Sequence, residues 1–275
     1  QPRFPEYLQR LSAVADVPVT SFASLIAALA VRVEFFHSRG ARISDHAVDV
    51  TLPVQAASAE ELEALFAKRL QGTLLNDVEN GLYLRGLLEA IGRVYANYGW
   101  TMCLHIGAQR NNNDRMRGLL GPDTGYDSIS DMSCSAGLAS LLNALDLDDR
   151  LPKTMLFCLN PNMNEVLSTM VGNFQDGTVA GKLQFGPAWW FNDHKEGNLQ
   201  QLVGFGNHSV LGVFVGMVTD SRSFASYPRH DYFRRLVCRQ IGEWVHGGEY
   251  PNDFEALATI VRGICYENAQ KYFQL

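Results

Sequence analysis

The stretch Val213–Phe224 of this sequence, VFVGMVTDSRSF, decides the fold prediction, because an apolar run leads directly into a cluster of polar side chains. Its apolar residues are typical of a strand buried on both faces, as in parallel sheets. Asp220 and Arg222 follow at the end of the run. Strands of parallel barrels deliver catalytic groups at their carboxyl ends, which makes these two residues the first site candidates. The other interpretation of this segment is a solvated turn with an accidental ion pair.

The composition is that of a globular chain with a sizeable core. The 275 residues are 47% hydrophobic and 19% charged, with a net charge of -6, so one large core or two modest ones can form. No basic stripe is available for nucleic acid or anionic lipid, and we expect neither nucleic acid nor a membrane as a partner. No apolar run approaches the roughly 20 residues of a membrane span, and the first residues do not resemble a signal peptide. The expected location is the cytoplasm.

Several classes of cofactor site have no counterpart in the sequence. The cysteines are odd in number, scattered and never in a CxxC arrangement, which predicts reduced thiols and no zinc knuckle. They are Cys103, Cys134, Cys158, Cys238 and Cys265. No glycine-rich phosphate loop of either nucleotide type occurs, so we expect no nucleotide cofactor.

Helical and strand-like periods alternate along the chain. The clearest helical patterns span residues 22–36, 58–66, 77–98, 164–174 and 228–244. Five apolar runs are candidate strands, near Ile43, Leu104, Leu156, Leu183 and Val215, and a helical period follows each. Repeated strand–helix units predict a parallel sheet with right-handed crossovers. The periods alone leave three architectures open: a doubly wound sheet, a full barrel with undetected strands, or part of a barrel whose first strands are absent.

Polar and aromatic side chains gather at the ends of these runs. His105 lies in the second run, and Arg110 follows it with three consecutive asparagines. Such a loop suits a polyhydroxylated ligand or hydrogen bonds to its own backbone. After the fourth run, Trp189 and Trp190 fit either the wall of a sugar pocket or a plug at a barrel rim.

Four segments carry a resemblance to a known family. They are KTMLFCLNPNMNEVLSTMVGNFQ, GKLQFGPAWWFND, FVGMVTDSRSFASYPRHDYFRRLVC and HIGAQRNNN. Together they resemble the uronate isomerase family, also called glucuronate isomerase, of the amidohydrolase superfamily, and the resemblance covers essentially the whole chain. It implies a (β/α)₈ TIM barrel, a divalent metal with zinc as the expected ion, and a homo-oligomer. It also implies a hexuronate substrate: D-glucuronate is interconverted with D-fructuronate, and D-galacturonate with D-tagaturonate.

The resemblance further implies that this chain supplies barrel strands 4 to 8. Asp220 would then end the eighth strand and His105 would lie on the fifth, so residues 1–275 would form the C-terminal part of a single catalytic domain. The His-x-His metal pair of the family's first strand does not occur among the seven histidines. We therefore expect an incomplete barrel, with the runs near Ile43 and Val215 as unpaired edges beside an apolar gap. Independent catalysis by this piece is not expected.

The chemistry of the implied reaction assigns roles to five residues. An aldose–ketose isomerisation through an enediol needs a base for the carbon proton, an acid or metal at the carbonyl oxygen, and cations for the uronate carboxylate. Asp220 is the first candidate for metal ligand or proton shuttle, and His105 for metal coordination or a hydrogen bond to a substrate oxygen. Arg222 and Arg110 are candidate anion clamps. Trp189 would stack on or shield the sugar.

Two other classes of function stay open at this point. A metal-dependent hydrolase of the same superfamily would share the fold, because fold alone does not fix chemistry. A non-catalytic partial barrel would bind sugars or serve in assembly. A preceding segment with His-x-His at a strand end would favour the enzyme. In an isomerase and in a hydrolase alike, four side chains should converge at the carboxyl end of the sheet: Asp220, Arg222, His105 and Trp189.

Overall fold

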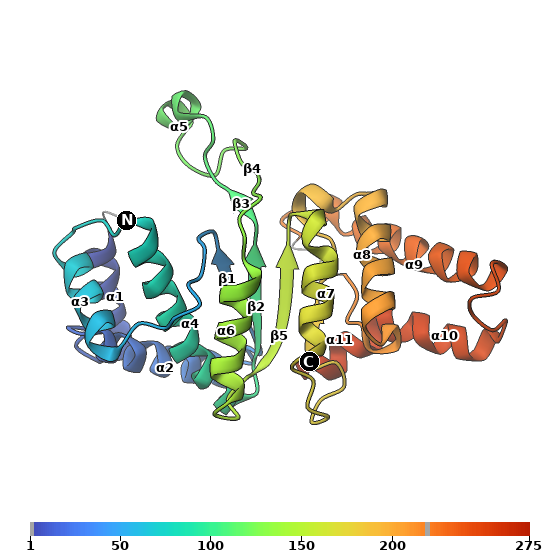
Figure 1. Ribbon diagram of the computed structural model, residues 1–275, viewed down its shortest axis with the longest axis horizontal. Helices are drawn as coiled ribbons and strands as arrows, with labels where there is room; N and C mark the ends of the chain where they lie inside the picture. The colour runs from blue at the N-terminus through green and yellow to red at the C-terminus, as the bar shows by residue number, and fades with distance from the viewer. Residues whose placement is uncertain (1–2, 218–220) are drawn as a thin grey trace. The chain divides into compact units, whose positions relative to one another are not determined.

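The computed structural model describes residues 3–217 and 221–275 (Figure 1). The chain forms two compact units. Unit 1 contains residues 1–44, 50–102 and 132–153, and unit 2 contains residues 45–49, 103–131 and 154–275. None of the helices in the described ranges combines the length and the apolar character needed to span a lipid bilayer.

Four strands form the main sheet and lie side by side in chain order. They are β1 (Ile43–Val48), β2 (Thr101–Ile106), β5 (Lys153–Cys158) and β6 (Leu183–Phe185). β5 and β6 are parallel, with Thr154 opposite Leu183 and Leu156 opposite Phe185. Every residue of these two strands is buried, as expected for the interior of a parallel sheet. The predicted α/β fold with a parallel sheet is confirmed.

Unit 1 is largely helical. Its helices are α1 (Phe4–Ala15), α2 (Phe22–Ser38), α3 (Ala59–Leu70), α4 (Asp77–Tyr98) and α6 (Ser135–Asp146). The side-chain oxygens of Ser21, Ser58 and Asn76 accept backbone N–H groups at the starts of α2, α3 and α4, which explains where these helices begin. α4 ends at Gly99 in the left-handed region. The three helices predicted in this part are confirmed.

Unit 2 contains the helices that follow the later strands. They are α5 (Asp114–Leu120), α7 (Asn164–Gly172), α8 (Lys195–His208), α9 (Pro228–His246), α10 (Phe254–Arg262) and α11 (Asn268–Phe273), with a π-helical turn at Gly263–Glu267. α7 packs against β6 and α8, and α8 packs against α9. The predicted helices near Asn164 and Pro228 are confirmed as α7 and α9.

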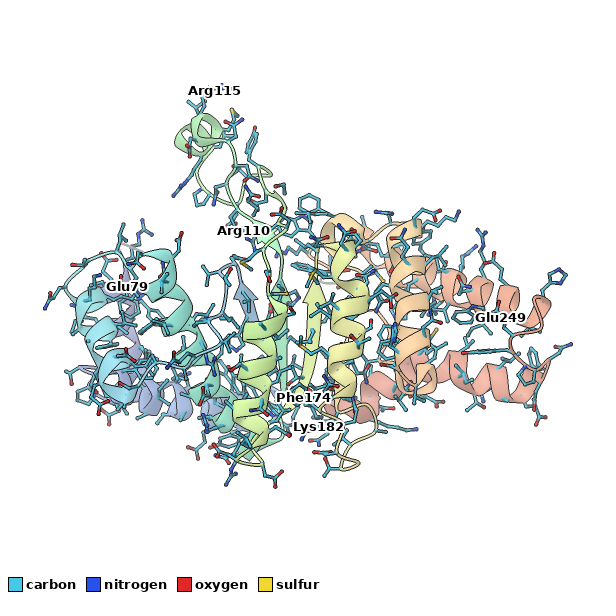
Figure 2. All side chains as sticks on the ribbon, in the orientation of Figure 1. Glu79, Arg110, Arg115, Phe174, Lys182 and Glu249 are labelled. Atoms are coloured by element: carbon cyan, nitrogen blue, oxygen red, sulfur yellow. The ribbon has the colours of Figure 1, made fainter. Side chains whose placement is uncertain are left out.

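An arm leaves the sheet after β2. The short strands β3 (Ala108–Gln109) and β4 (Ser128–Ile129) pair antiparallel at its base, and α5 forms its tip. Figure 2 shows Arg110 at the base and Arg115 at the tip. No residue of α5 is buried.

The fifth predicted strand is wrong for the residues that are described. Leu211–Val213 form a 3-10 turn, and residues 214–217 have no regular secondary structure. The cause is the buried amide of Gln184 on β6. Its Nε2 donates to Val213 O at 3.1 Å, and its Oε1 accepts from Val215 N at 3.1 Å. The segment thus lies beside β6 as expected. It is held there by hydrogen bonds from the Gln184 side chain and not by the backbone hydrogen bonds of a paired strand.

Within the described residues, β1 and β6 are the two edges of a four-stranded sheet. A barrel of this type closes with eight strands. The described part of the chain therefore does not close a barrel.

Candidate functional site

His105 lies on β2 next to Asp45 on β1. The Nδ1 atom of His105 is 2.5 Å from Asp45 Oδ1. Nδ1 has no hydrogen-bond partner among the described residues, so we describe this contact as a close pair of one carboxylate and one imidazole. The Asp45 side chain is 74% exposed and the His105 side chain 23%. The pair therefore lies where a solute can reach it.

Two aromatic side chains hold the plane of the His105 ring. Phe157 on β5 stacks on it with a centroid distance of 4.5 Å and an interplanar angle of 6°. Trp189, in the loop after β6, meets it edge to face at 4.5 Å and 73°. Aromatic contacts of this kind contribute roughly 0.5–1.5 kcal/mol beyond area burial. β5 and the loop after β6 thus supply the walls around the imidazole that β2 carries.

The pKa values of two neighbouring groups, Asp45 and His46, are lowered in this region. The contact with His105 holds the pKa of the Asp45 carboxyl below its usual value, so Asp45 is an anion at neutral pH. Burial lowers the pKa of the His46 imidazole, although the charge of Asp45 acts in the opposite direction. His46 is therefore neutral where an exposed histidine would already be partly protonated.

The lowered pKa of His46 predicts a pH-dependent stability. Between the folded-state pKa and about 6.5, the ordinary histidine value, the unfolded chain binds more protons, so the free energy of unfolding should rise with pH and level off above it. The measurement is urea unfolding at about pH 5 and about pH 7.5. In His46→Gln this part of the pH dependence should disappear, and in His246→Gln, which removes an exposed histidine, it should persist. Equal pH dependence in both variants would contradict the assignment.

Arg110, a predicted anion clamp, is surrounded by carboxylates. Its guanidinium lies 3.3 Å from Asp49, 3.4 Å from Asp127 and 3.8 Å from Asp123, and it lies over the Trp190 ring at 5.0 Å. Asp127 is nearly buried and also accepts the Asn111 N–H at 2.7 Å. The positive charge of Arg110 is thus already compensated, and an incoming anion would have to replace one of these carboxylates.

The loop after β6 displays an aromatic pair. Trp190 and Phe191 stack at 4.6 Å and are 40% and 39% exposed. Trp190 has a φ of 48°, a conformation that is uncommon for a residue with a Cβ atom and costs on the order of 1 kcal/mol. Two buried side chains fix this loop to the rest of unit 2. Asn192 donates a hydrogen bond to Leu159 O at 2.7 Å, and Asp193 forms an ion pair with Arg229 at 3.0 Å.

The predicted convergence is confirmed for one pair of residues, His105 and Trp189. Asp220 lies outside the described residues. Arg222 is described and has an exposed side chain, and its role and its position relative to His105 stay predictions.

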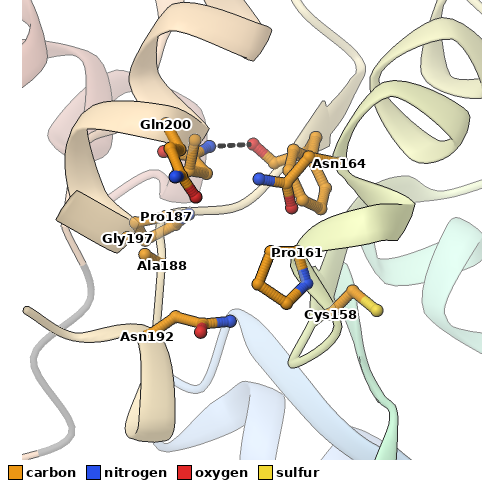
Figure 3. Close-up of a pocket in the computed structure, with 10 residues that line it drawn as sticks. Cys158, Pro161, Asn164, Pro187, Ala188, Asn192, Gly197 and Gln200 are labelled. Carbon is orange, nitrogen blue, oxygen red and sulfur yellow. Dashed lines mark hydrogen bonds between the residues drawn. The ribbon is translucent and has the colours of Figure 1, made fainter. Parts of the chain in front are cut away.

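A pocket opens on the other face of β5 (Figure 3). Cys158 lines it, whereas the neighbouring Phe157 contacts His105, and adjacent strand residues point to opposite faces. Amides of Asn164, Asn192 and Gln201 contribute to its wall. This pocket is therefore separate from the His105 site.

A metal ion would need three or four protein ligands. In the described ranges no group of three His, Cys, Asp or Glu side chains is placed to hold one. Of the two predicted ligands, only His105 is described. The described residues do not form a metal site by themselves.

Comparison with known proteins identifies the family of this chain. Residues 1–273 match the family model for glucuronate isomerase. The chain belongs to the glucuronate isomerase family. It is 51% identical over 270 residues to a uronate isomerase of Caldicellulosiruptor saccharolyticus and 49% identical over 272 residues to one of Salmonella paratyphi B. These alignments cover 98% and 99% of this chain but only 58% of each relative, so the chain spans less than two thirds of their length.

Solved structures of the family have the same fold. The uronate isomerase of Thermotoga maritima matches with a TM-score of 0.89 at 27% identity, over 99% of this chain and 58% of that chain. The glucuronate isomerase of Caulobacter crescentus matches with a TM-score of 0.87 at 27% identity, over 100% of this chain and 55% of that chain.

Sequence reasoning did not assign three residues that shape the site: Asp45, Phe157 and Asp127. Asp45 was visible as a carboxylate in an apolar run. Its contact with His105 depends on the register between β1 and β2, which the sequence does not display. Phe157 is indistinguishable in sequence from any other core residue.

Proposed function

We propose that this chain carries part of the active site of an aldose–ketose isomerase that interconverts D-glucuronate with D-fructuronate, and D-galacturonate with D-tagaturonate. The match of residues 1–273 to the family supports this most directly. The site around His105 agrees with it, because a polar pair walled by Phe157 and Trp189 suits a sugar. The chemistry is a proton transfer between C1 and C2 of the open-chain uronate through an enediol.

We propose the following roles. Arg222 binds the uronate carboxylate through its planar fork, and Asp220 moves the proton between the two carbons. His105 hydrogen-bonds the substrate oxygen at C1 or C2. Trp189 covers the sugar and keeps water from the enediol. Arg110 can serve as a second clamp if the substrate carboxylate exchanges with one of its aspartate partners.

The architecture that goes with this proposal is a (β/α)₈ barrel in which the chain supplies strands 4 to 8 and belongs to one catalytic domain. The longer family members have the additional length that further strands would need. In the alternative assignment, Asp220 and His105 would instead bind a divalent ion, with zinc expected, together with ligands from those strands, because one carboxylate cannot both coordinate a cation and act as the base. A cytoplasmic location and a homo-oligomeric assembly belong to the same proposal.

The test is an isomerase assay on the full-length enzyme without nicotinamide. Glucuronate and galacturonate should each be converted to the 2-keto isomer, followed by chromatography. In D2O, deuterium from the solvent should appear at the carbon that is protonated, because an enediol exchanges its proton whereas a direct hydride shift does not. The 275-residue chain assayed alone should be inactive. If the full-length enzyme consumes neither uronate, the proposed function is wrong.

A further inference from the structure

Gly186 begins the loop after β6 and lies directly against the ring of Phe157. A Cβ atom added at Gly186 would lie 2.5 Å from Cε1 of that ring, 2.7 Å from Cδ1 and 2.9 Å from Cζ. Carbon atoms that are not bonded attract each other best at about 3.5–4.0 Å, so a methyl group has no room here. The backbone of Gly186 is not in the left-handed region. The position therefore needs glycine for its lack of a side chain and not for its backbone freedom.

The backbone of Gly186 is held by hydrogen bonds from two directions. Its N–H donates to Leu156 O on β5 at 2.8 Å, and its carbonyl oxygen accepts from Nε2 of Gln201 on α8 at 2.6 Å. The Gln201 side chain is buried, so a shift of the loop that breaks these bonds would leave buried polar groups unpaired. A methyl group at Gly186 should therefore displace the Phe157 ring and leave the loop in place.

The Phe157 ring passes such a displacement on to His105. The two rings stack with centroids 4.5 Å apart and an angle of 6° between their planes, and the Phe157 side chain is buried in the core of unit 2. A shift of roughly 1 Å would restore ordinary contact with the added carbon, and it would change this stack because a close-packed core transmits displacements. Trp189, three residues after Gly186, contacts the same imidazole directly. The loop after β6 thus acts on His105 at two points.

We propose that Gly186 is a positioning residue: its lack of a side chain sets the place of the Phe157 ring, and that ring sets the place of the His105 imidazole toward the substrate. A misplacement of about 1 Å can lower a reaction rate by up to about 100-fold, even when the substituted residue does not touch the reacting atoms. The kinetic effect rests on the proposed function, whereas the effect on the position of the two rings does not.

The first experiment is a crystal structure of the full-length Gly186→Ala enzyme beside that of the parent. The two hydrogen bonds of residue 186 should be kept, and the Phe157 ring should be displaced so that its stack on His105 is altered. An unchanged stack beside a displaced loop would overturn the inference, whether or not the enzyme isomerises uronates. If Gly186→Ala does not fold, the double variant Gly186→Ala/Phe157→Val should restore folded protein, and its failure to do so would equally overturn the inference.

The second experiment measures kcat per folded molecule in a double-mutant cycle. Gly186→Ala should lower kcat on the order of tenfold or more. In the Phe157→Val background, which lacks the ring atoms that the methyl group meets, the same substitution should have almost no further effect. A general loss of stability would not produce this non-additivity.

Gly172→Ala is the control for this cycle. Gly172 lies at the exposed end of α7, and a Cβ atom added there meets nothing within 4 Å, so kcat should be unchanged. Unaltered kcat in Gly186→Ala, or an equal loss in both backgrounds, would overturn the positioning role. With the parent enzyme active, the proposed function would still stand.

Discussion

The Arg222→Lys variant of the full-length enzyme should isomerise uronates on the order of a hundredfold more slowly than the parent, a loss of about 3 kcal/mol in transition-state stabilisation. Lysine keeps the charge but cannot present two parallel N–H groups to a carboxylate. Steady-state kinetics on glucuronate measures the effect, and thermal unfolding should show little change because the Arg222 side chain is exposed.

Arg235→Lys is the matched control for this variant, since Arg235 is an exposed arginine on α9 that pairs with Asp231. It should retain full activity. Near-normal turnover by Arg222→Lys would show that this arginine does not clamp the substrate. Asp220→Asn should abolish most activity, and a fully active Asp220→Asn enzyme would remove that carboxylate from the mechanism.

Replacement of Phe157 by alanine should lower the free energy of unfolding by about 3–5 kcal/mol. Phe157 is 3% exposed and belongs to the core of unit 2. The substitution also removes the stack that holds the His105 ring, so turnover per folded molecule should fall as well. Denaturant unfolding gives the first quantity, and kcat corrected for the folded fraction gives the second.

Phe66→Ala separates the two effects. Phe66 is 1% exposed in the core of unit 1, so its loss should destabilise the protein by a similar amount. Turnover per folded molecule should be unaffected. Equal losses of turnover in both variants would mean that stability alone explains the result for Phe157.

The elements that the sequence predicted correctly are those with strong local signals. The helices begin at capping residues such as Ser21 and Ser58 and carry a regular apolar face. The strands β2 and β5 contain the apolar runs at residues 102–104 and 155–158. The run around Val215 has the same composition, but the interaction that decides its conformation comes from Gln184, about thirty residues away. A local pattern does not contain that information.

The candidate site was predictable in part for the same reason. His105 and Trp189 could be selected because barrel enzymes place their active sites at the carboxyl ends of the strands. That Arg110 would lie among three aspartates depends on Asp49, which follows β1, meeting Asp123 and Asp127 from the loop between α5 and β4. Contacts of this kind follow from tertiary structure, and the residue type of Arg110 alone suggests only an anion.

The hydrogen bonds of Gln184 restrict which amino acids this position can accept. One side chain must donate to Val213 O and accept from Val215 N, and it is fully buried. Glutamate accepts but, when ionised, does not donate, lysine and arginine only donate, and leucine does neither. Asparagine has both groups but is one methylene shorter. Each of these leaves a buried backbone group unpaired, at a cost of about 1–3 kcal/mol. Sequence drift at this site should therefore be confined to glutamine, although nothing about KLQF itself marks the residue as irreplaceable.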